Sequence, residues 1–331
     1  MNKLTDVTIV GAGPVGLFGA FYAGLRGMSV RIVDSLTEPG GQLTALYPEK
    51  FVYDMPGFPE ILAKDLADGL LAQANRFHPE LALGERCETL EQRDGHWLLR
   101  THTEEHPSKT VIICAGIGAF SPTKIGVDRE DHFTGAGLMY GVRSKENLRG
   151  KKVIIIGGGD SALDWSLGLE HIAREIVLVH RRDGFRAHEE NVRKLRASTV
   201  EVRTWEVVTE LHGEDQLHGV TVLNKQTHEV TELSCDSLIV NIGFKAALGP
   251  LKGWGLEIVK NKIRANSRME TNLLGVYAAG DICTHDAKLD LIATGVGEVC
   301  TAVNYAKTFI DPEAEPFPGH SSDMALPALD G

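Results

Sequence analysis

A strand, a glycine-rich turn and a helix follow one another twice in this chain, and this repeat constrains the fold more than any other feature. The first copy starts at Asp6 with DVTIVGAGPVG, and the second starts at Lys152 with KVIIIGGGDSA. An apolar helical pattern follows each copy, and then a second short strand at residues 30–34 and 176–180. Parallel strands need a crossover of this kind, so the sequence predicts an α/β chain with two Rossmann-like units.

The order of these units predicts that one domain is inserted into another. A chain of 331 residues is too long for one typical core and suits two domains. Residues 111–116 and 237–243 are apolar strands that end in glycine, and they are predicted to be the crossings between the domains. The simplest arrangement is a first domain of residues 1–113 and 245–331, ending in a proline-rich tail, with a second domain of residues 114–244 inserted.

The first glycine-rich turn is predicted to bind a dinucleotide. Gly11, Gly13 and Gly16 form the pattern G-x-G-x-x-G, with Pro14 inside it. The first glycine permits the tight turn, the second lets a pyrophosphate approach, and the third lets the helix pack on the strand. The helix start offers unpaired N–H groups to the phosphates. Asp34 ends the next strand, where a ribose hydroxyl needs an acceptor.

A late strand favours FAD over NAD at this first site. Residues 275–281 form an apolar strand that ends in Gly280 and Asp281. A carboxylate at the end of a strand that returns beside the N-terminal sheet suits the ribityl chain or the pyrophosphate of a flavin. The alternative, that Asp281 caps the segment after it, stays open.

The second glycine-rich turn is predicted to bind NADPH. Its residues Gly157, Gly159, Asp160, Ser161 and Ala162 follow the G-x-G-x-x-A pattern. At the end of the following strand an NAD site would carry an acid.

This chain has arginines at that position instead of an acid. The sequence there is HRRDGFR, in which Arg181 and Arg182 follow His180 and Arg186 lies within reach of the same place, and all four residues are expected to contact NADPH. Guanidinium groups in place of the acid convert a 2′-hydroxyl site into a 2′-phosphate site. The alternative is a solvated basic loop.

The composition limits the partners and the location. The formal net charge is −11, whereas nucleic-acid binding needs a basic surface, so no nucleic-acid partner is expected. No apolar run approaches the roughly 20 residues of a membrane span, and the N-terminus lacks the apolar core of a signal peptide. These features predict a soluble intracellular enzyme with no membrane segment.

The cysteines suggest neither a disulfide framework nor a metal site. They are Cys87, Cys114, Cys235, Cys283 and Cys300, and no two of them have CxxC spacing. Their simplest interpretation is as small buried side chains in a reducing compartment, and no metal is expected.

Several segments resemble those of the low-molecular-weight thioredoxin reductase superfamily. They are GGQLTALYPEK at 40–50, YDMPGFP at 53–59, GGGDSALDW at 157–165, HRRDGFRA at 180–187, METN at 269–272 and YAAGDI at 277–282. Within this superfamily the chain is most similar to the thioredoxin-reductase-like ferredoxin/flavodoxin–NADP⁺ reductases of bacteria. The resemblance covers nearly the whole chain. It implies an NADPH domain inserted into an FAD domain, a homodimer and a cytoplasmic location.

One motif of the thioredoxin reductases is missing. Those enzymes carry a redox CxxC shortly before the second glycine-rich strand, where this chain has GLMYGVRSK at residues 137–145. Without a dithiol, two electrons have no route from a flavin to a disulfide substrate. Thioredoxin reduction is therefore not expected, and the resemblance implies ferredoxin or flavodoxin as partner.

The resemblance also implies residues that contact the flavin. Tyr47 matches the residue that stacks on one face of the isoalloxazine ring. His320 in the tail matches the aromatic residue on the other face, which the partner subunit supplies. The FAD contacts expected from the glycine-rich turn and the resemblance together are Gly11, Gly13, Pro14, Gly16, Asp34, Gln42, Tyr47, Cys87 (through its backbone), Phe120, Asp281, Ser321 and Ser322.

The expected activity follows from the two cofactors. Nicotinamide delivers a two-electron hydride, ferredoxin and flavodoxin exchange single electrons, and a flavin can do both. The chain is thus expected to be a ferredoxin–NADP⁺ reductase in which no side chain need be a nucleophile or general acid. Two alternatives stay open: an NADPH-dependent flavin or quinone diaphorase, and a redox-sensing protein that binds both nucleotides without turnover.

Overall fold

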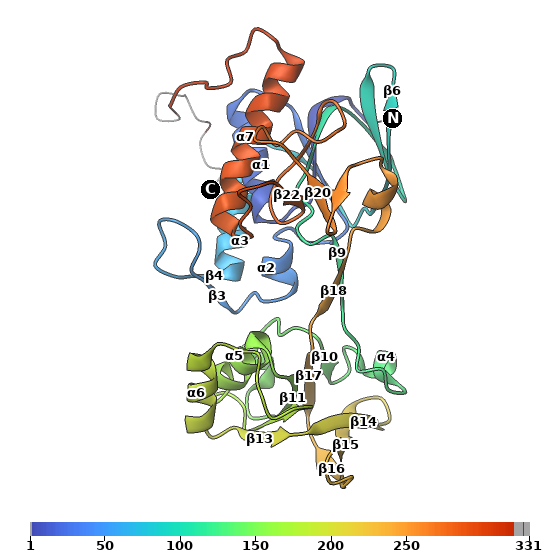
Figure 1. Cartoon of the computed structure of the whole chain (residues 1–331), viewed down its shortest axis with the longest axis vertical. Coiled ribbons are helices and arrows are strands. Elements are labelled where there is room, and N and C mark those ends of the chain that lie inside the picture. Colours follow the sequence, from blue (N-terminus) through green and yellow to red (C-terminus); the bar gives the residue numbers. More distant parts are fainter. Residues whose placement is uncertain (1, 321–326, 328–331) are drawn as a thin grey trace. The chain divides into compact units, whose positions relative to one another are not determined.

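The computed structural model describes residues 2–320 and residue 327. They form two compact units (Figure 1), which we call the terminal unit (Met1–Phe120 and Ala246–Gly331) and the inserted unit (Ser121–Lys245). The chain passes between the units at β9 (Ala119–Pro122) and β18 (Phe244–Ala247), and these strands pair with each other.

The two strands that the sequence marks as crossings lie inside the units. Residues 111–113 belong to β8 (Glu105–Ile113) of the terminal unit, and residues 237–241 form β17 (Ser237–Asn241) of the inserted unit. The crossings lie a few residues further along the chain, because each of them begins just after the glycine that ends the buried strand. A two-stranded ribbon of four-residue strands has too little apolar patterning to be recognised from sequence.

Among the described residues, a seven-stranded sheet forms the centre of the terminal unit. Its order is β5-β2-β1-β8-β7-β6, and β21 pairs with β8. The strands are β1 (Thr5–Val10), β2 (Val30–Asp34), β5 (Glu80–Leu83), β6 (Cys87–Arg93), β7 (His96–Thr101), β8 and β21 (Val276–Ala278). All pairs among β5, β2, β1, β8 and β21 are parallel, whereas β7 and β6 extend the sheet in antiparallel fashion. Val7, Ile9 and Ile112 are completely buried, as expected for parallel strands that are covered on both faces.

Long helices cover one face of this sheet. They are α1 (Pro14–Leu25), α3 (Ala63–Asn75) and α7 (Ile292–Ile310), and α1 packs against both of the others. Leu17, Leu66 and Val299 share one apolar core with strand residues. Close packing depends on small residues, since a Cβ on Gly19 would lie 2.6 Å from Cγ2 of Val299.

Shorter elements complete the terminal unit. On the other face of the sheet, Val10, Ile113 and Trp254 share a second core. The elements there are η2 (Gly249–Gly253), β19 (Ile258–Val259), β20 (Lys262–Arg264) and β22 (Cys283–Thr284), and the connection between β2 and α3 contains α2 (Gln42–Ala45), β3 (Phe51–Val52) and β4 (Ile61–Leu62).

The inserted unit repeats the parallel arrangement on a smaller scale. Its five-stranded sheet has the order β10-β17-β11-β12-β13, with every pair parallel. Helices α5 and α6 share a core with Ile155 on one face, and a three-stranded antiparallel sheet packs against Ile154 on the other. The elements are β10 (Leu138–Met139), β11 (Lys152–Gly157), β12 (Glu175–His180), β13 (Glu201–Thr204), β14 (Glu206–Gly213), β15 (Leu217–Asn224), β16 (Val230–Ser234), α4 (Glu130–Phe133), η1 (Lys145–Leu148), α5 (Asp160–Gly168) and α6 (Glu189–Ala197).

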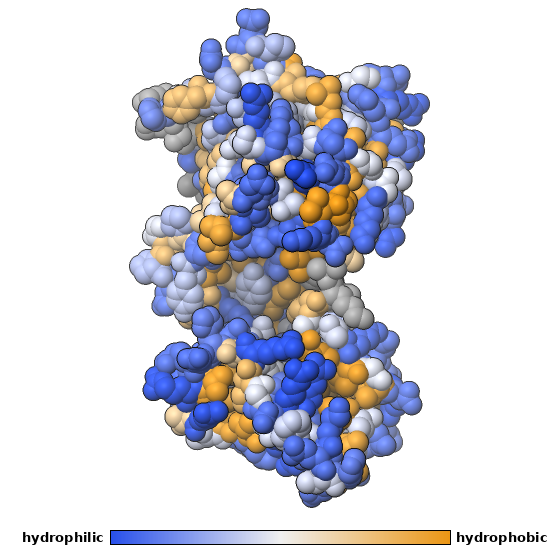
Figure 2. Space-filling view, viewed as in Figure 1, coloured by the Kyte–Doolittle hydropathy of each residue, from blue (hydrophilic) through white to orange (hydrophobic). Residues whose placement is uncertain are grey.

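The face of the described chain that Figure 2 shows is mostly polar. Figure 2 shows hydrophilic residues over much of each unit, interrupted by separate apolar patches. Leu274 and Tyr53 are the most exposed of the large apolar side chains that the structure describes. No helix in the described ranges is long and apolar enough to cross a membrane.

Candidate nucleotide-binding sites

A cavity of about 570 Å³ opens in the terminal unit where the parallel strands end. Gly11 follows β1, Asp34 ends β2, Cys114 follows β8 and Gly280 follows β21, and all four line the cavity. Ligands of open α/β sheets bind at this carboxyl edge. Of the predicted FAD contacts, the cavity is lined by Gly11, Gly13, Pro14, Asp34, Gln42, Tyr47, Cys87 and Asp281.

The first glycine-rich turn has the geometry that its sequence predicts. Gly11 has a φ of +112°, and a Cβ there would lie 2.4 Å from the carbonyl oxygen of Cys114. A Cβ on Gly16 would lie 1.9 Å from the carbonyl oxygen of Gly11, so only glycine lets the helix approach. At Gly13 the nearest neighbour of a Cβ would be Cα of Gly41 at 4.0 Å, which leaves space for a ligand. No side chain of the described chain caps α1, so its first N–H groups can bind an anion.

Asp34 connects the end of β2 to this turn. Its Oδ2 accepts a hydrogen bond of 2.6 Å from the backbone N–H of Ala12, and its Oδ1 accepts one of 2.8 Å from that of Leu36. Burial raises the pKa of Asp34, and the two N–H donors oppose this rise. Each carboxylate oxygen can accept a further bond, so a ribose hydroxyl in the cavity would find an acceptor held in position.

Tyr47 and Asp281 also line this cavity. Burial, and then the carboxylates of Asp281 and Asp54, raise the pKa of Tyr47 to about 12, so its hydroxyl stays protonated. Burial also raises the pKa of Asp281, with Asp290 acting in the same direction. No described residue donates a hydrogen bond to the Asp281 carboxylate, which leaves a partly buried acceptor facing the cavity.

Sequence reasoning missed Asp54, which holds the start of α7. Its Oδ2 accepts a hydrogen bond of 2.9 Å from the backbone N–H of Ile292, and both residues line the cavity. The pair is separated by 238 residues, so no local pattern could have revealed it. A carboxylate at a helix N-terminus is favourable both as an acceptor and through the helix dipole.

The predicted tail residue His320 does not lie at this cavity in the single chain. It is exposed, and its ring meets that of Phe317 edge-on at 5.6 Å. The preceding segment is held near α1 by a hydrogen bond of 2.6 Å from Arg26 to the carbonyl oxygen of Glu315. Ser321 and Ser322 lie outside the described residues, as does the side chain of Phe120.

The second glycine-rich turn lies between β11 and α5 of the inserted unit. A Cβ on Gly157 would lie 2.4 Å from the carbonyl oxygen of Asn241 and 2.6 Å from Cβ of Ala162, so the turn is closed at this residue. Gly159, in contrast, has open space where a Cβ would be. Asp160 and Ser161 begin α5, and both are exposed.

The arginine loop folds back onto this turn. The backbone N–H of Arg186 donates to the carbonyl oxygen of Gly158 at 2.7 Å, and that of His188 donates to Oδ1 of Asp160 at 2.8 Å. The Asp160 carboxylate thus fixes the loop rather than pointing unpaired toward a ligand. These two bonds hold residues 181–188 beside the start of α5.

The ring of His180 packs against the arginine loop. It is buried, its ring stacks on that of Phe185 at 5.1 Å, and its Nε2 lies 3.1 Å from the carbonyl oxygen of Gly184. Burial, aided by Arg181 and Arg182, lowers its pKa, so the ring is neutral with the proton on Nε2. Nothing larger than glycine fits at Gly158, because a Cβ there would lie 2.0 Å from Cε1 of His180.

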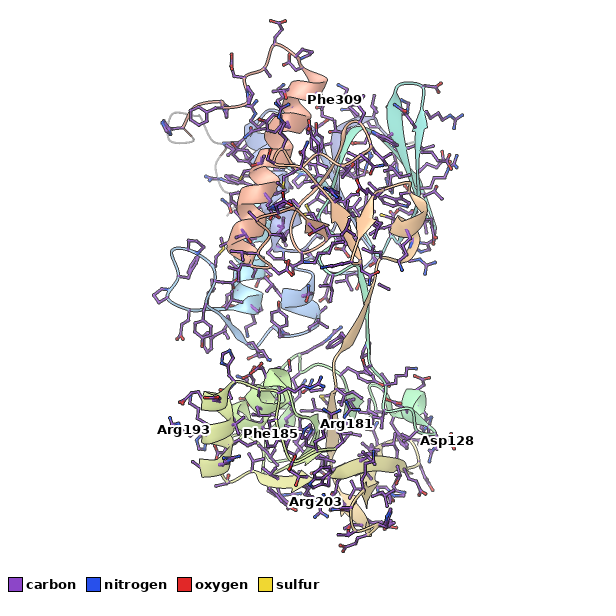
Figure 3. All side chains as sticks on the ribbon, in the orientation of Figure 1. Asp128, Arg181, Phe185, Arg193, Arg203 and Phe309 are labelled. Atoms are coloured by element: carbon purple, nitrogen blue, oxygen red, sulfur yellow. The ribbon has the colours of Figure 1, made fainter. Side chains whose placement is uncertain are left out.

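The guanidinium groups of the loop are available to a ligand. Arg181, Arg182 and Arg186 are exposed, and none has an ion pair with another described residue. Figure 3 labels Arg181 and Phe185 in this unit. Arg186 lines a second cavity, together with Asp160 and Arg193, and Arg193 pairs with Glu190 at 2.8 Å. Three exposed cations beside a glycine-rich turn suit a phosphate group.

The cysteines are free and protonated. Cys114, Cys235 and Cys283 are buried, and Cys87 and Cys300 are partly buried. Burial raises the pKa of Cys87, Cys235 and Cys283 to about 12 and that of Cys300 to about 11, and it also raises that of Cys114. A thiol needs its thiolate form for disulfide chemistry, so the structure offers no reactive dithiol.

These features define a class: α/β proteins with two dinucleotide-binding folds, one inserted into the other. Residues 5–304 match the pyridine nucleotide-disulphide oxidoreductase family. Similar proteins include Ferredoxin--NADP reductase 2 of Shouchella clausii (strain KSM-K16), 50% identical over 325 residues, and Ferredoxin--NADP reductase of Geobacillus thermodenitrificans (strain NG80-2), 51% identical over 325 residues. Each alignment covers 98% of this chain and 98% of the relative. The chain belongs to the pyridine nucleotide-disulphide oxidoreductase family, and within it to the ferredoxin–NADP reductases.

Solved structures agree on the fold. Thioredoxin reductase of T. acidophilum has a TM-score of 0.77 and 26% identity, covering 95% of this chain and 100% of that one. Thioredoxin reductase of Lactococcus lactis has a TM-score of 0.76 and 25% identity, covering 92% and 99%. The thioredoxin-reductase-like fold that the sequence predicts is therefore confirmed. This sequence contains no CxxC.

Proposed function

We propose that this protein is an FAD-dependent ferredoxin–NADP⁺ reductase, which transfers electrons between NADPH and a one-electron carrier, ferredoxin or flavodoxin. The observation that carries the proposal is the combination, in one chain, of the cavity at Asp34 and Asp281 with an arginine loop at a second glycine-rich turn, and with no reactive dithiol. Relatives of this name, about half identical over nearly the full chain, support it.

The terminal unit is the FAD-binding domain in this proposal. The open space at Gly13 and the uncapped start of α1 suit the pyrophosphate, and Asp34 suits a ribose. The Asp281 carboxylate, to which no described residue donates a hydrogen bond, and the protonated Tyr47 hydroxyl suit the flavin half. The cavity therefore offers backbone N–H groups to the pyrophosphate and carboxylate acceptors to the hydroxyl groups of FAD.

The inserted unit is the NADPH-binding domain. Gly157, Gly159 and the start of α5 hold the pyrophosphate, as in the first unit. Arg181, Arg182 and Arg186 bind the 2′-phosphate with charge-assisted hydrogen bonds, which an adenosine with a free 2′-hydroxyl cannot accept in the same number. This arrangement favours NADPH over NADH.

The chain's own residues have a binding and shielding role in the reaction. FAD, when bound, takes up the two electrons of a hydride and releases them one at a time. Val10 and Val33 keep part of the cavity wall apolar, and the Tyr47 hydroxyl remains a donor at all ordinary pH values. No nucleophile or general acid is required, and the five protonated thiols take no part.

The resemblance of this chain to the ferredoxin/flavodoxin–NADP⁺ reductases supports further proposals. The protein is a cytoplasmic homodimer, and the tail of one subunit covers the flavin of the other. His320 stacks on the ring face opposite Tyr47, and Ser321, Ser322, Phe120, Gln42 and the backbone of Cys87 complete the FAD contacts. The exposed position of His320 and its separation from the cavity of its own chain are compatible with a role across the dimer.

NADPH-driven reduction of cytochrome c, with and without ferredoxin or flavodoxin, tests the function. A ferredoxin–NADP⁺ reductase reduces cytochrome c at a rate that rises and saturates with the carrier. If the rate of cytochrome c reduction does not depend on either carrier while free flavins or quinones are reduced rapidly, the protein is a diaphorase. If NADPH binds but is not oxidised, the protein is a redox sensor.

A further inference from the structure

A buried carboxylate on α7 accepts hydrogen bonds from the segment that follows β21. Glu298 is 8% exposed. Its Oε2 accepts from the backbone N–H of Gly280 at 2.8 Å and from Sγ of Cys283 at 3.5 Å, and its Oε1 lies 3.0 Å from Nε2 of His285. Nζ of Lys288 lies 2.8 Å from both oxygens. All four donors belong to residues 280–288, so one side chain fastens this whole segment to the helix.

The Glu298–Lys288 pair is shielded from water on both sides. The side chain of Lys288 is 7% exposed and that of Glu298 is 9% exposed. Burial of an ion pair costs free energy unless additional hydrogen bonds compensate, and here three further donors satisfy the carboxylate. Apolar residues of similar size could stabilise the fold equally well, so the pair is better explained by the conformation that it specifies than by stability alone.

The cluster is not a cation site. The ligand atoms of Cys283, His285 and Glu298 lie within 4.8 Å of one another, as a metal site would require. The ammonium group of Lys288, however, already bonds both carboxylate oxygens. Burial also raises the pKa of Cys283 to about 12, which keeps its sulfur protonated. The same atoms therefore form a hydrogen-bonded network around one carboxylate.

The network fixes the peptide between Ala279 and Gly280, one residue before Asp281. Gly280 has a φ of +79°, and a Cβ there would lie 3.3 Å from Cγ2 of Val15 in α1. A Cβ on Gly295 of α7 would lie 2.6 Å from the same Val15 atom and 3.3 Å from Cα of Gly280. Gly280 is thus confined between two helices, and its N–H points to Glu298. Asp281, the next residue, has little freedom to move.

We propose that Glu298 is a positioning residue for FAD: through Gly280 it holds the Asp281 carboxylate at the flavin half of the cavity. The proposal rests on the proposed function, since it places FAD in this cavity. Glu298 itself does not line the cavity, so its effect on the cofactor must pass through the segment that it holds.

A double-mutant cycle on FAD binding tests this inference. Glu298→Gln, Asp281→Asn and the double variant are purified, stripped of FAD and titrated with FAD. Glu298→Gln loses the ion pair and should weaken FAD binding about tenfold or more, the effect expected from losing a charged hydrogen bond. It should also change the visible circular dichroism of the flavin. In the Asp281→Asn background the same substitution should weaken binding less than about twofold, because the effects of two residues coupled through one backbone segment are not additive.

The controls separate positioning from stability. Glu130→Gln removes a carboxylate that is equally buried in the inserted unit, where it accepts from the N–H groups of Ile125 and Gly126 and from Tyr140. That substitution should lower the melting temperature and leave FAD affinity and dichroism unchanged. If Glu298→Gln does not fold, Glu298→Gln with Lys288→Met removes both charges, and the same cycle is run on that pair.

Three outcomes are decisive. Loss of FAD affinity that depends on Asp281 supports the inference. Unchanged FAD affinity and dichroism in Glu298→Gln, or an effect that adds fully to that of Asp281→Asn, overturns it while leaving the proposed function intact. Failure of the unsubstituted protein to bind FAD at all overturns the proposed function instead.

Discussion

The backbone N–H of Ala12 donates a hydrogen bond of 2.6 Å to the carboxylate of Asp34, and this bond joins the glycine-rich turn after β1 to the end of β2. The acid that the sequence marks as a ribose acceptor is therefore also part of the turn that faces the pyrophosphate. A second bond, from Leu36, prevents the carboxylate from rotating away. One side chain thus contributes to both halves of the predicted adenosine diphosphate site.

Asp34→Asn should accordingly weaken FAD binding. The amide NH2 of asparagine cannot accept the hydrogen bond from the N–H of Ala12, and the negative charge is lost as well. Charge-assisted hydrogen bonds contribute about 1.5–3 kcal/mol each, so we expect the affinity for FAD to fall at least tenfold. Titration of the FAD-free protein measures it. Asp94→Asn, at an exposed turn where the side chain is 84% accessible, is the matched control and should have no effect. Equal affinity in both variants would remove Asp34 from the site.

Removing Arg181 and Arg182 together should lower kcat/KM for NADPH by a few orders of magnitude, at about 1.5–3 kcal/mol for each charged bond to the phosphate. The value for NADH should change much less, because NADH has no 2′-phosphate. Steady-state kinetics with both nucleotides measure the difference. Arg149→Ala, which removes an exposed arginine paired with Glu146 in the same unit, should change neither value. Equal losses with NADPH and NADH would show that the pair does not read the phosphate.

Replacing all five cysteines by serine or alanine should leave NADPH-dependent diaphorase activity largely intact. The buried thiols are protonated at neutral pH and are not paired, so they contribute packing rather than chemistry. Melting temperature is followed in parallel to detect packing losses. If one substitution stops reoxidation of the flavin while FAD remains bound, a thiol relay exists after all.

The stability that Glu298 contributes should disappear in acid. Burial opposes its ionisation, but bonds from Lys288, His285 and Gly280 lower its pKa below the ordinary 4.5. A group whose pKa is lower in the folded state stabilises the fold above its unfolded pKa and loses that contribution as the pH falls through the folded value. Urea unfolding should thus show a difference between the unsubstituted protein and Glu298→Gln that is full above pH 4.5 and shrinks below it. A difference independent of pH would mean that the charge is unimportant.

Truncation before Pro316 should alter the visible absorbance of the flavin and the rate of its reduction by NADPH, while FAD stays bound by the first glycine-rich turn. The truncated chain ends at Glu315, whose terminal carboxylate can accept from Arg26 in place of the carbonyl oxygen, so only the segment with His320 is lost. Stopped-flow reduction is the measurement. An unchanged spectrum and rate would make His320 an ordinary surface histidine.

Sequence patterns predicted those parts of this protein whose conformation depends on contacts between residues close together in the chain. Both glycine-rich turns were recognisable because a larger residue would clash with backbone nearby in the chain, as the close approach of Gly16 to Gly11 illustrates. The end of α5 was not recognisable, because apolar residues continue as far as Ile172 in the sequence while the helix ends at Gly168 and the chain continues as turns. Gly168 lacks the backbone preference that would continue the helix.

Contacts between distant residues were beyond sequence reasoning. Asp54 accepts a hydrogen bond from Ile292, and Glu298 accepts hydrogen bonds from a segment that has no recognisable sequence motif. Aspartate and glutamate are common on surfaces, so composition does not distinguish a buried acceptor from a solvated one. The tertiary fold alone brings these carboxylates to the N–H groups that they satisfy.

The close fit of the His180 ring over Gly158 has an evolutionary consequence. These two positions cannot vary independently, because any side chain at position 158 would occupy the space of the imidazole. Relatives that carry alanine or serine at position 158 should have a small residue at position 180, and should then lack the stacking partner that Phe185 now has. The two positions should therefore covary in aligned relatives, together with position 185.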